Sequence, residues 1–395
     1  MPISSQRSGR DERAALYPPE LLPVFSQSFI TSFDLFDEYV ARLALGIYQT
    51  LGLDRICANE VTVAESMDKA GLDSAAALAP TSWILATLAS RGWIDRIVAA
   101  DGQSRYRGRS TLPMLETGEI LEKQRQHDPA CLPSYEIADM AAMHYPAVLR
   151  GAASGEQALF GPEGIVPWVR YFSNENPLYA VSNKVGAVAA AGLPVAVHEK
   201  ILEIGAGLGS GADSLLGELL CNGGESRALS YHLTEISPLF LKRARRNLSA
   251  KHGNTNLVFA ELDIDRPFPA QIVAPGSFSL VYGVNVLHVA RDLAATLADL
   301  RQALRSDGML VMAECVRPFR NVPLPIELVF NLLESFRNPV LVPQWRPNGG
   351  FLTPEQWTAA LSANGFTDVR IFPDIASIRD DYPNFMIAAI VARRT

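Results

Sequence analysis

The sequence has few cysteines, no long apolar run and no excess of basic residues, and each absence excludes a class of protein. Its four cysteines are far apart and form no Cys-x-x-Cys pair, so we expect neither a disulfide framework nor a cysteine zinc site. No apolar run approaches the roughly 18–20 residues of a membrane span. The formal net charge is -7, which argues against nucleic acid as the main partner. The first residues lack the apolar segment of a secretory signal, so a cytoplasmic protein is expected.

The composition is that of a globular chain large enough for two or three domains. Of its 395 residues, 48% are hydrophobic. We read residues 1–19, which show no apolar period, as a flexible arm. From residue 20 to 47 apolar residues recur three or four positions apart, which predicts a long helix broken once.

Residues 20–110 are expected to form a helical, winged-helix-like region. Helices are predicted at 63–72 and at 78–90, the second with Pro80 in its first turn. Two short strands around Asp101-Gly102 predict a hairpin. Residues 111–196 are predicted to be a helical lid or connector that carries an aromatic-rich stretch from 158 to 179.

Residues 197–395 show a different pattern, in which short apolar runs alternate with helical stretches. The runs are 201–204, 229–233, 257–260, 278–282 and 309–312, followed by 369–372 and 386–391. This alternation predicts an α/β domain with a parallel, Rossmann-like sheet. Residues 317–350 interrupt it and are long for a loop in a compact domain, so we interpret them as a lid or substrate wall with a helix around 325–336.

A glycine-rich turn follows the first strand of this domain. It reads Glu203-Ile-Gly205-Ala-Gly207-Leu-Gly209, and glycines allow the backbone to approach a ligand closely. Glu235 ends the second strand, where a carboxylate can accept hydrogen bonds from both hydroxyls of an adenosine ribose. After the third strand, Asp263 can reach an adenine amine and Ile264 can cover the ring. In the simpler alternative, Glu235 caps the next helix and Asp263 begins a turn.

Two adenosine cofactors compete for this site. An NAD pyrophosphate turn has the spacing G-x-G-x-x-G, whereas this turn reads G-x-G-x-G with Ser210 next. The segment Leu-Glu-Ile-Gly-Ala-Gly-Leu-Gly resembles the first motif of the class I methyltransferases, and the resemblance covers roughly residues 199–395. It implies a seven-stranded, mostly parallel sheet that binds S-adenosylmethionine. Glu203, Gly209 and Asn285 are further expected cofactor contacts.

His288 and Glu314 are the candidate catalytic pair. They follow the fourth and fifth strands, which are neighbours in the methyltransferase sheet, so we expect them to meet at its carboxyl edge. A carboxylate beside an imidazole fixes its tautomer, and such a base suits methyl transfer to a weakly acidic O–H or C–H. Asp292 near His288 does not complete the three ligands of a catalytic zinc, so no metal is expected.

The same segments resemble two methyltransferase groups. Asn-Val-Leu-His-Val-Ala-Arg-Asp-Leu and Met-Ala-Glu-Cys-Val-Arg-Pro are similar to methyltransferase domains embedded in polyketide synthases. That resemblance implies polyketide or antibiotic biosynthesis and a dyad, here His288 and Glu314, acting on a carrier-bound acyl chain. The winged-helix-like front half instead resembles homodimeric small-molecule O-methyltransferases of the plant type. Carbon or oxygen methylation, and a carrier-bound or free acceptor, therefore stay open.

The acceptor pocket is expected to be walled by aromatic residues of the lid and of the insertion: Trp168, Tyr171, Phe172, Tyr179, Phe330, Phe336 and Trp345. In the simpler alternative, these aromatic residues only pack the helical layer onto the sheet. Two other kinds of protein compete with an enzyme. A DNA-binding regulator is disfavoured because residues 54–107 hold six basic against seven acidic residues, and the helix at 78–90 has no basic residue. A non-catalytic protein that keeps the cofactor site would leave the dyad idle, and a methyltransfer assay distinguishes it.

Overall fold

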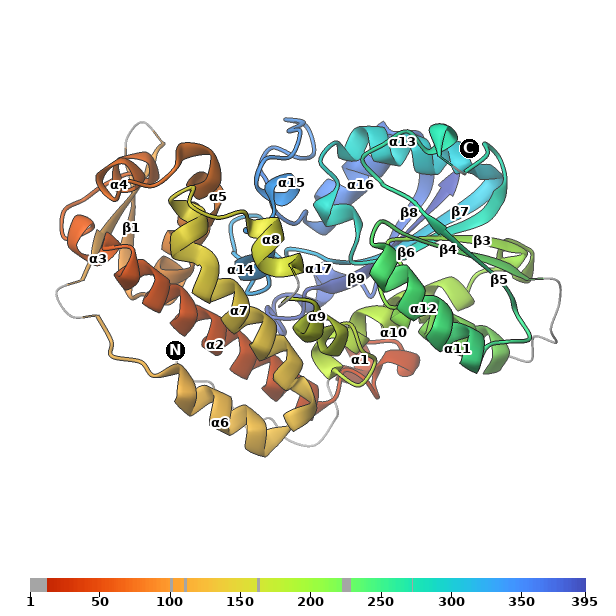
Figure 1. The fold of residues 1–395 in the computed structure, drawn as a ribbon, viewed down its shortest axis with the longest axis horizontal. Helices are drawn as coiled ribbons and strands as arrows, with labels where there is room; N and C mark the ends of the chain where they lie inside the picture. The colour runs from red at the N-terminus through yellow and green to blue at the C-terminus, as the bar shows by residue number, and fades with distance from the viewer. Residues whose placement is uncertain (1–12, 100–101, 110–111, 162–163, 222–228, 272) are drawn as a thin grey trace.

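The computed structural model describes residues 13–99, 102–109, 112–161, 164–221, 229–271 and 273–395. A helical N-terminal region stands beside an α/β domain, and short helices lie between them (Figure 1). Of the expected arm, residues 1–12 lie outside the described residues. Residues 13–16 form a helical turn, α1 (Arg13–Leu16). Among the described helices, none has the length and apolar character needed to cross a membrane.

The N-terminal region is built around two long helices, α2 and α7, that lie side by side and run in the same direction (Figure 1). The Phe36 and Tyr135 ring centroids lie 5.3 Å apart, and further along both helices the Tyr39 hydroxyl donates to Asp139 Oδ1. Ser26 caps α2 by accepting from the Phe29 backbone N–H, so the predicted long helix breaks before this residue. The region's elements are η1 (Pro19–Leu21), α2 (Gln27–Thr50), α3 (Leu53–Ile56), α4 (Val63–Lys69), α5 (Ser74–Ser90), β1 (Ile94–Val98), β2 (Ser104–Gly108), α6 (Thr117–His127), η2 (Pro129–Cys131), α7 (Leu132–Leu149), α8 (Gly155–Phe160) and α9 (Ile165–Tyr171).

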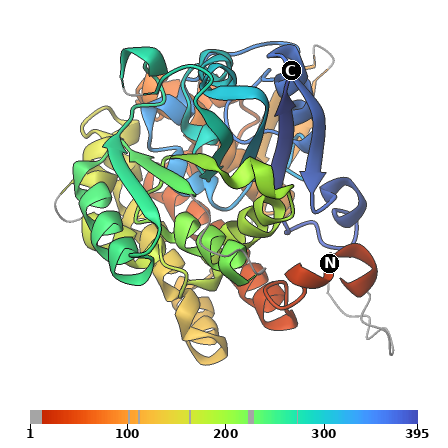
Figure 2. The ribbon, with the colours of Figure 1, turned by 90° about the vertical axis from the view of Figure 1, so that its right-hand side faces the viewer.

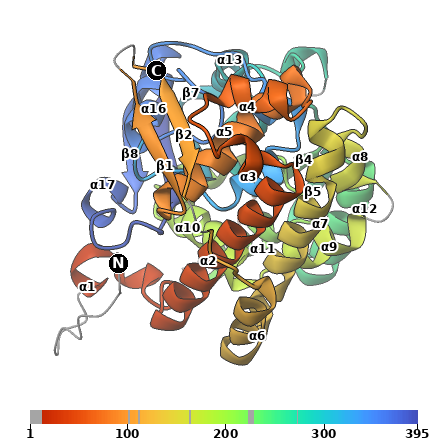
Figure 3. The same ribbon diagram turned by 90° about the vertical axis from the view of Figure 1, so that its left-hand side faces the viewer.

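The predicted hairpin is confirmed as the antiparallel pair β1–β2, seen beside α4 and α5 in Figure 3. The prediction for the preceding helix was wrong at its start. Asp73 accepts hydrogen bonds from the backbone N–H groups of Ala75 and Ala76, so α5 begins at Ser74 and Pro80 lies inside it. The Asp73 cap and an alanine-rich first turn therefore outweigh the proline as a start signal.

The C-terminal domain has the predicted seven-stranded sheet, in the order β5-β4-β3-β6-β7-β9-β8 (Figure 2). Strands β3 to β7 run parallel, and β9 is antiparallel to both of its neighbours. The strands are β3 (Lys200–Ile204), β4 (Ser230–Glu235), β5 (Asn256–Glu261), β6 (Phe278–Val284), β7 (Leu304–Cys315), β8 (Phe366–Phe372) and β9 (Ile387–Arg394). The fold is thus a mostly parallel class I sheet behind a helical region.

Helices cover both faces of this sheet. They are α10 (Pro177–Ala191), η3 (Val195–His198), α11 (Ser210–Cys221), α12 (Pro238–Lys251), η4 (Phe268–Ala270), η5 (Leu287–Val289), α13 (Leu293–Ala303), α16 (Pro354–Ala363) and α17 (Ile375–Ile378). Gly186 of α10 lies so close to Ala313 and the Tyr282 ring that a Cβ there would approach both at 2.9 Å. Close contact of this kind makes α10 part of the layer that covers the sheet.

The insertion at 317–350 forms two short helices instead of one, α14 (Glu327–Phe330) and α15 (Glu334–Arg337). It joins the two regions through buried hydrogen bonds. The Trp83 indole of α5 donates to the Leu324 carbonyl at 3.0 Å, and the Tyr145 hydroxyl of α7 donates to the Leu328 carbonyl at 2.6 Å. The N-terminal region is therefore anchored directly to the insertion.

Candidate functional site

The glycine turn connects β3 to α11 at the carboxyl edge of the sheet. Gly205, Gly207 and Gly209 all have positive φ angles, of 58°, 55° and 84°. A Cβ on Gly205 would overlap Val286, whereas a Cβ on Gly207 would meet no atom within 4 Å. Gly205 thus permits close packing of the turn, and Gly207 presents bare backbone to the open space in front of it.

Glu235 is tied to this turn. Its buried carboxylate accepts hydrogen bonds from the backbone N–H groups of Gly207 and Ser237, both at 2.9 Å. Burial raises the pKa of Glu235, and these backbone donors oppose that shift. The cap of α12 is instead Ser237, which accepts from the Phe240 N–H. Glu235 is therefore held beside the glycine turn, and Ser237, not Glu235, caps α12.

A cavity of about 500 Å³ opens at this edge of the sheet. Of the expected cofactor contacts, six line it: Gly205, Gly207, Glu235, Asp263, Ile264 and Asn285. The Asp263 carboxylate also accepts from the Asp265 N–H at 2.9 Å, so it forms the turn foreseen in the simpler alternative while it faces the cavity. Asn285 has a positive φ of 51° and accepts from the Cys315 N–H at 3.2 Å.

Two expected cofactor contacts do not line the cavity. Glu203 points from β3 into the protein, where burial raises its pKa to about 8 and leaves Oε2 without a hydrogen-bond partner among the described residues. Gly209 faces α12, since a Cβ there would approach Leu248 at 2.7 Å. Glu203 faces away from the cavity because successive side chains of a strand point to opposite faces of the sheet. Gly209 faces away because it directly precedes α11, which packs against α12.

His288 and Glu314 meet as expected. His288 Nδ1 lies 2.8 Å from Glu314 Oε2, and both side chains are almost fully buried. Glu314 Oε1 accepts from the backbone N–H groups of Val286 and Leu287, at 2.9 and 2.6 Å. Because an ionised carboxylate only accepts hydrogen bonds, Nδ1 carries the proton and Nε2 is the lone-pair nitrogen. His288 lines the cavity, and its Nε2 has no partner among the described residues.

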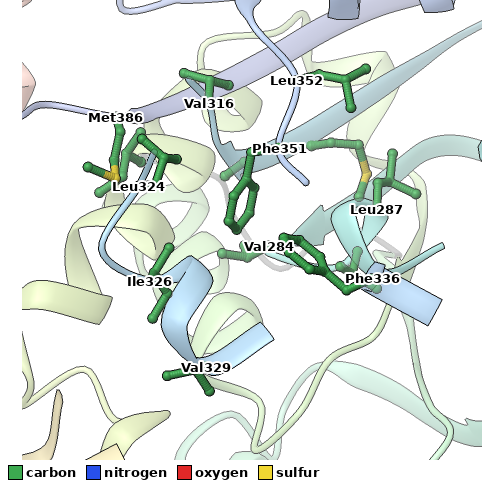
Figure 4. Close-up of a cluster of buried hydrophobic side chains, with 14 of the residues drawn as sticks. Val284, Leu287, Val316, Leu324, Ile326, Val329, Phe336, Phe351, Leu352 and Met386 are labelled. Atoms are coloured by element: carbon green, nitrogen blue, oxygen red, sulfur yellow. The ribbon is translucent and has the colours of Figure 1, made fainter. Parts of the chain in front are cut away.

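Aromatic rings from the insertion and from the loop that follows it lie around the imidazole. Phe330 and Phe351 have ring centroids 4.4 and 4.9 Å from that of His288, and Phe336 follows at 6.2 Å. Figure 4 shows Phe351 among buried apolar side chains that include Val284, Ile326 and Phe336. Sequence reasoning missed Phe351 because it stands in a loop before α16, with no periodic pattern to indicate its direction.

The aromatic residues that we expected from the lid lie at this cavity. Trp168, Tyr171 and Tyr179 all line the cavity, and the Trp168 indole donates to the Leu159 carbonyl at 2.9 Å. Trp345 is buried but does not line the cavity. It lies in the turn closed by the Val342 N–H bond to the Arg346 carbonyl. Of the three insertion residues expected to wall the pocket, Phe330 lines the cavity, and Phe336 and Trp345 do not.

The lid is joined to the glycine turn by polar contacts. The Asn174 amide donates to the Ser210 carbonyl at 3.0 Å, and the Asn183 amide donates to Asn174 Oδ1 at 2.8 Å. The cavity is therefore bounded by the sheet edge, lid and insertion together. Among the described residues, no group of three His, Cys, Asp or Glu side chains is arranged to hold a metal ion.

Comparisons with known proteins agree with this geometry. Residues 202–310 match a family model described as a methyltransferase domain. Highly reducing polyketide synthase FUM1 of Gibberella moniliformis is 28% identical over 312 residues, which are 77% of this chain and 11% of that synthase. Methyltransferase calH of Penicillium decumbens is 29% identical over 238 residues, 58% of this chain and 57% of that protein. The chain thus spans only about a tenth of the synthase's length.

Two solved structures share the fold along nearly the whole chain. The CurJ carbon methyltransferase superposes with a TM-score of 0.74 at 20% identity, covering 95% of this chain and 96% of that one. The trans-methyltransferase CalH, solved with SAH, superposes with a TM-score of 0.59 at 19% identity, covering 93% and 92%. Sheet order and superposition together show the class I methyltransferase fold, and residues 202–310 match the methyltransferase domain model. Within that class, the chain has the fold of these two methyltransferases and is related in sequence to part of polyketide synthases.

Proposed function

We propose that the protein transfers a methyl group from S-adenosylmethionine to a polyketide-type acyl acceptor, with His288 as the general base. One observation carries the proposal. His288, which pairs with buried Glu314 and whose Nε2 has no partner among the described residues, lines the same cavity as the glycine turn and Glu235. In-line methyl transfer requires a general base and a cofactor-binding site in the same cavity.

The residues present fit the proposed cofactor. Gly207 leaves room where a side chain would intrude, and the carboxylates of Glu235 and Asp263 supply acceptors for ribose hydroxyls and an adenine amine. Ile264 offers an apolar contact for the ring. When bound, S-adenosylmethionine supplies an electrophilic methyl group on a sulfonium, and the aromatic lid residues Trp168 and Tyr171 keep water away from the space in front of it.

His288 and Glu314 divide the work of proton removal. Nε2 accepts the proton of an acceptor O–H or C–H, and Glu314 stabilises the resulting imidazolium through Nδ1–H. Because the Val286 and Leu287 N–H groups hold Glu314 Oε1, only Oε2 is left for the imidazole. The pair is thereby fixed in one orientation before the acceptor arrives.

The acceptor is proposed to be an acyl chain of specialised metabolism, presented free or on a carrier protein. The walls around His288 are aromatic and apolar, which suits a largely hydrocarbon chain. The similar proteins are a polyketide synthase and methyltransferases, one titled a carbon methyltransferase, and these names support an activated carbon as the methylated atom.

The test is mass spectrometry of β-ketoacyl chains, both carrier-bound and as free thioesters, incubated with deuterium-labelled S-adenosylmethionine. We expect one labelled methyl group on the acceptor, and fragment analysis assigns it to carbon or oxygen. Omission of the acceptor is the control. Binding of the cofactor without transfer to any acceptor of either kind would instead favour the non-catalytic ligand-binding protein.

A further inference from the structure

A second cavity, of about 630 Å³, lies between the N-terminal region and the insertion. One wall comes from α5 and the β1–β2 hairpin, including Trp83 and Arg96. The other wall comes from the insertion, including Arg320 and Arg337. It shares no lining residue with the site around His288, so it is a separate cavity.

The walls of this second cavity carry a surplus of positive charge. Four arginines line it, and Glu327 is the single acidic residue among its lining residues. Glu327 is paired with Arg317. Arg96 donates to the Ser104 hydroxyl and Arg337 to the Leu332 carbonyl, but within the described residues Arg96, Arg320 and Arg337 form no ion pair with a carboxylate. Three of the four guanidinium groups therefore have no carboxylate within ion-pair distance among the described residues.

Unused hydrogen-bond donors accompany this charge. The Nε atoms of Arg317 and Arg337 are buried and have no partner among the described residues. A buried donor without a partner costs free energy, and both of these arginines line the cavity. Beside the guanidinium groups, Leu78, Trp83 and Pro339 provide apolar surface for an organic body.

We propose that this cavity binds a phosphate monoester whose oxygens are held by Arg96, Arg320 and Arg337. Guanidinium groups match phosphate oxygens in pairs, and a monoester near neutral pH carries a charge of about −1.5 to −2. Three guanidinium groups that lack a carboxylate partner among the described residues favour such a dianion over a carboxylate, which carries a single charge. The apolar wall accommodates the ester's organic chain.

The second cavity and the cavity around His288 are lined by neighbouring residues of the same chain segments. On α14 and its flanks, Glu327 and Asn331 line the second cavity, whereas Ile326 and Phe330 line the first. Likewise Gly350 lines the second cavity, and the next residue, Phe351, contacts the His288 ring. A ligand in the second cavity therefore touches the same backbone segments that hold the aromatic rings around the base.

The proposal is tested by calorimetric titration of the full chain with 4′-phosphopantetheine and with pantetheine, which lacks the phosphate. We expect the phosphate to tighten binding at least tenfold and inorganic phosphate to compete. Arg320→Glu and Arg96→Glu, at exposed positions, should each abolish that advantage. Arg107→Glu is the matched control, because Arg107 is exposed on the same hairpin and does not line the cavity.

Equal affinity for the two ligands, equal effects of Arg320→Glu and Arg107→Glu, or equally tight binding of a pantothenate carboxylate would each overturn the proposal. Turnover then shows where the phosphate comes from. A KM that is lower for a phosphopantetheine-linked acyl acceptor than for its pantetheine analogue, with the difference lost in Arg320→Glu, assigns the phosphate to the acceptor. If the titration shows phosphate binding but the two acceptors have equal KM values, the site binds a separate phosphorylated ligand. The titration is independent of methyl transfer, so its failure leaves the proposed function untouched.

Discussion

The two sides of the main cavity are built from different chemistry. On the cofactor side, backbone groups of the glycine turn and the carboxylates of Glu235 and Asp263 offer many hydrogen-bonding atoms. On the side proposed for the acceptor, three phenylalanine rings lie around His288, whose Nε2 has no partner in the part of the chain that the structure describes. The first side is suited to holding a polar molecule in one pose. The second side is suited to proton removal by His288, since apolar surroundings strengthen a polar interaction between the imidazole and an acceptor.

This division predicts that some substitutions lower S-adenosylmethionine affinity and others lower turnover. Each side is anchored to different strands: Glu235 ends β4, whereas His288 follows β6 and Glu314 lies in β7. Substitutions beside His288 should therefore leave S-adenosylmethionine affinity nearly unchanged, and substitutions beside Glu235 should leave turnover at saturating cofactor nearly unchanged.

The largest effect is expected on the acceptor side. His288→Ala should lower turnover about 10²- to 10⁴-fold, the usual size of a general-base effect, and leave S-adenosylmethionine affinity near wild type. Steady-state kinetics and calorimetry measure the two quantities. His144→Ala, which removes an imidazole from α7 away from the cavity, is the control and should keep full turnover. Equal turnover of the two variants would show that the dyad is structural.

A smaller effect is expected on the cofactor side. Glu235→Ala should weaken S-adenosylmethionine binding by about 1–3 kcal/mol, roughly 5- to 150-fold, because it leaves the Gly207 N–H without its partner and removes the ribose acceptor. Turnover at saturating cofactor should change much less. Glu261→Ala is the matched control, since Glu261 stands opposite Glu235 on β5 but is exposed outside the cavity. Wild-type affinity in Glu235→Ala contradicts the assignment.

The smallest effect concerns stability behind the turn. Burial raises the pKa of Glu203 to about 8, so the folded state holds this proton after the unfolded chain, with its ordinary carboxyl pKa, has released it. Stability from this group is therefore present below about pH 4.5 and is lost as pH rises towards 8. Glu203→Gln should flatten the fall of Tm between pH 5 and 8. A Tm that falls as steeply as in the wild type argues that the carboxyl is ionised in the folded protein.

Much of the cofactor side was predictable from the sequence because it depends on local signals. Gly205 and Gly207 follow directly after a strand, and Glu235 and Asp263 follow the next two, so topology alone brings them to one edge. The same rule placed His288 beside Glu314. Glu203 and Gly209 were predicted less well, because adjacent positions in a strand or turn face opposite ways and the motif does not show which way each one faces.

The acceptor side depends on contacts between distant segments, which a single sequence does not show. Trp168 and Tyr179 were placed correctly because they precede the first strand closely enough to fold over its edge. Trp345 lies in the insertion and Phe351 directly after it, both in irregular segments where no periodicity indicates direction, and only Phe351 contacts His288.

The most direct test of the account is the turnover of Glu314→Gln. Since Glu314 Oε1 accepts two backbone N–H groups, the amide oxygen of glutamine must take that place, and its NH₂ group must face His288 Nδ1. Nδ1 then becomes the acceptor and the proton moves to Nε2, which can no longer act as a base. We predict that turnover falls about 10²- to 10⁴-fold, as in His288→Ala, while Tm and S-adenosylmethionine affinity stay near wild type. Turnover within a few-fold of wild type would contradict the account.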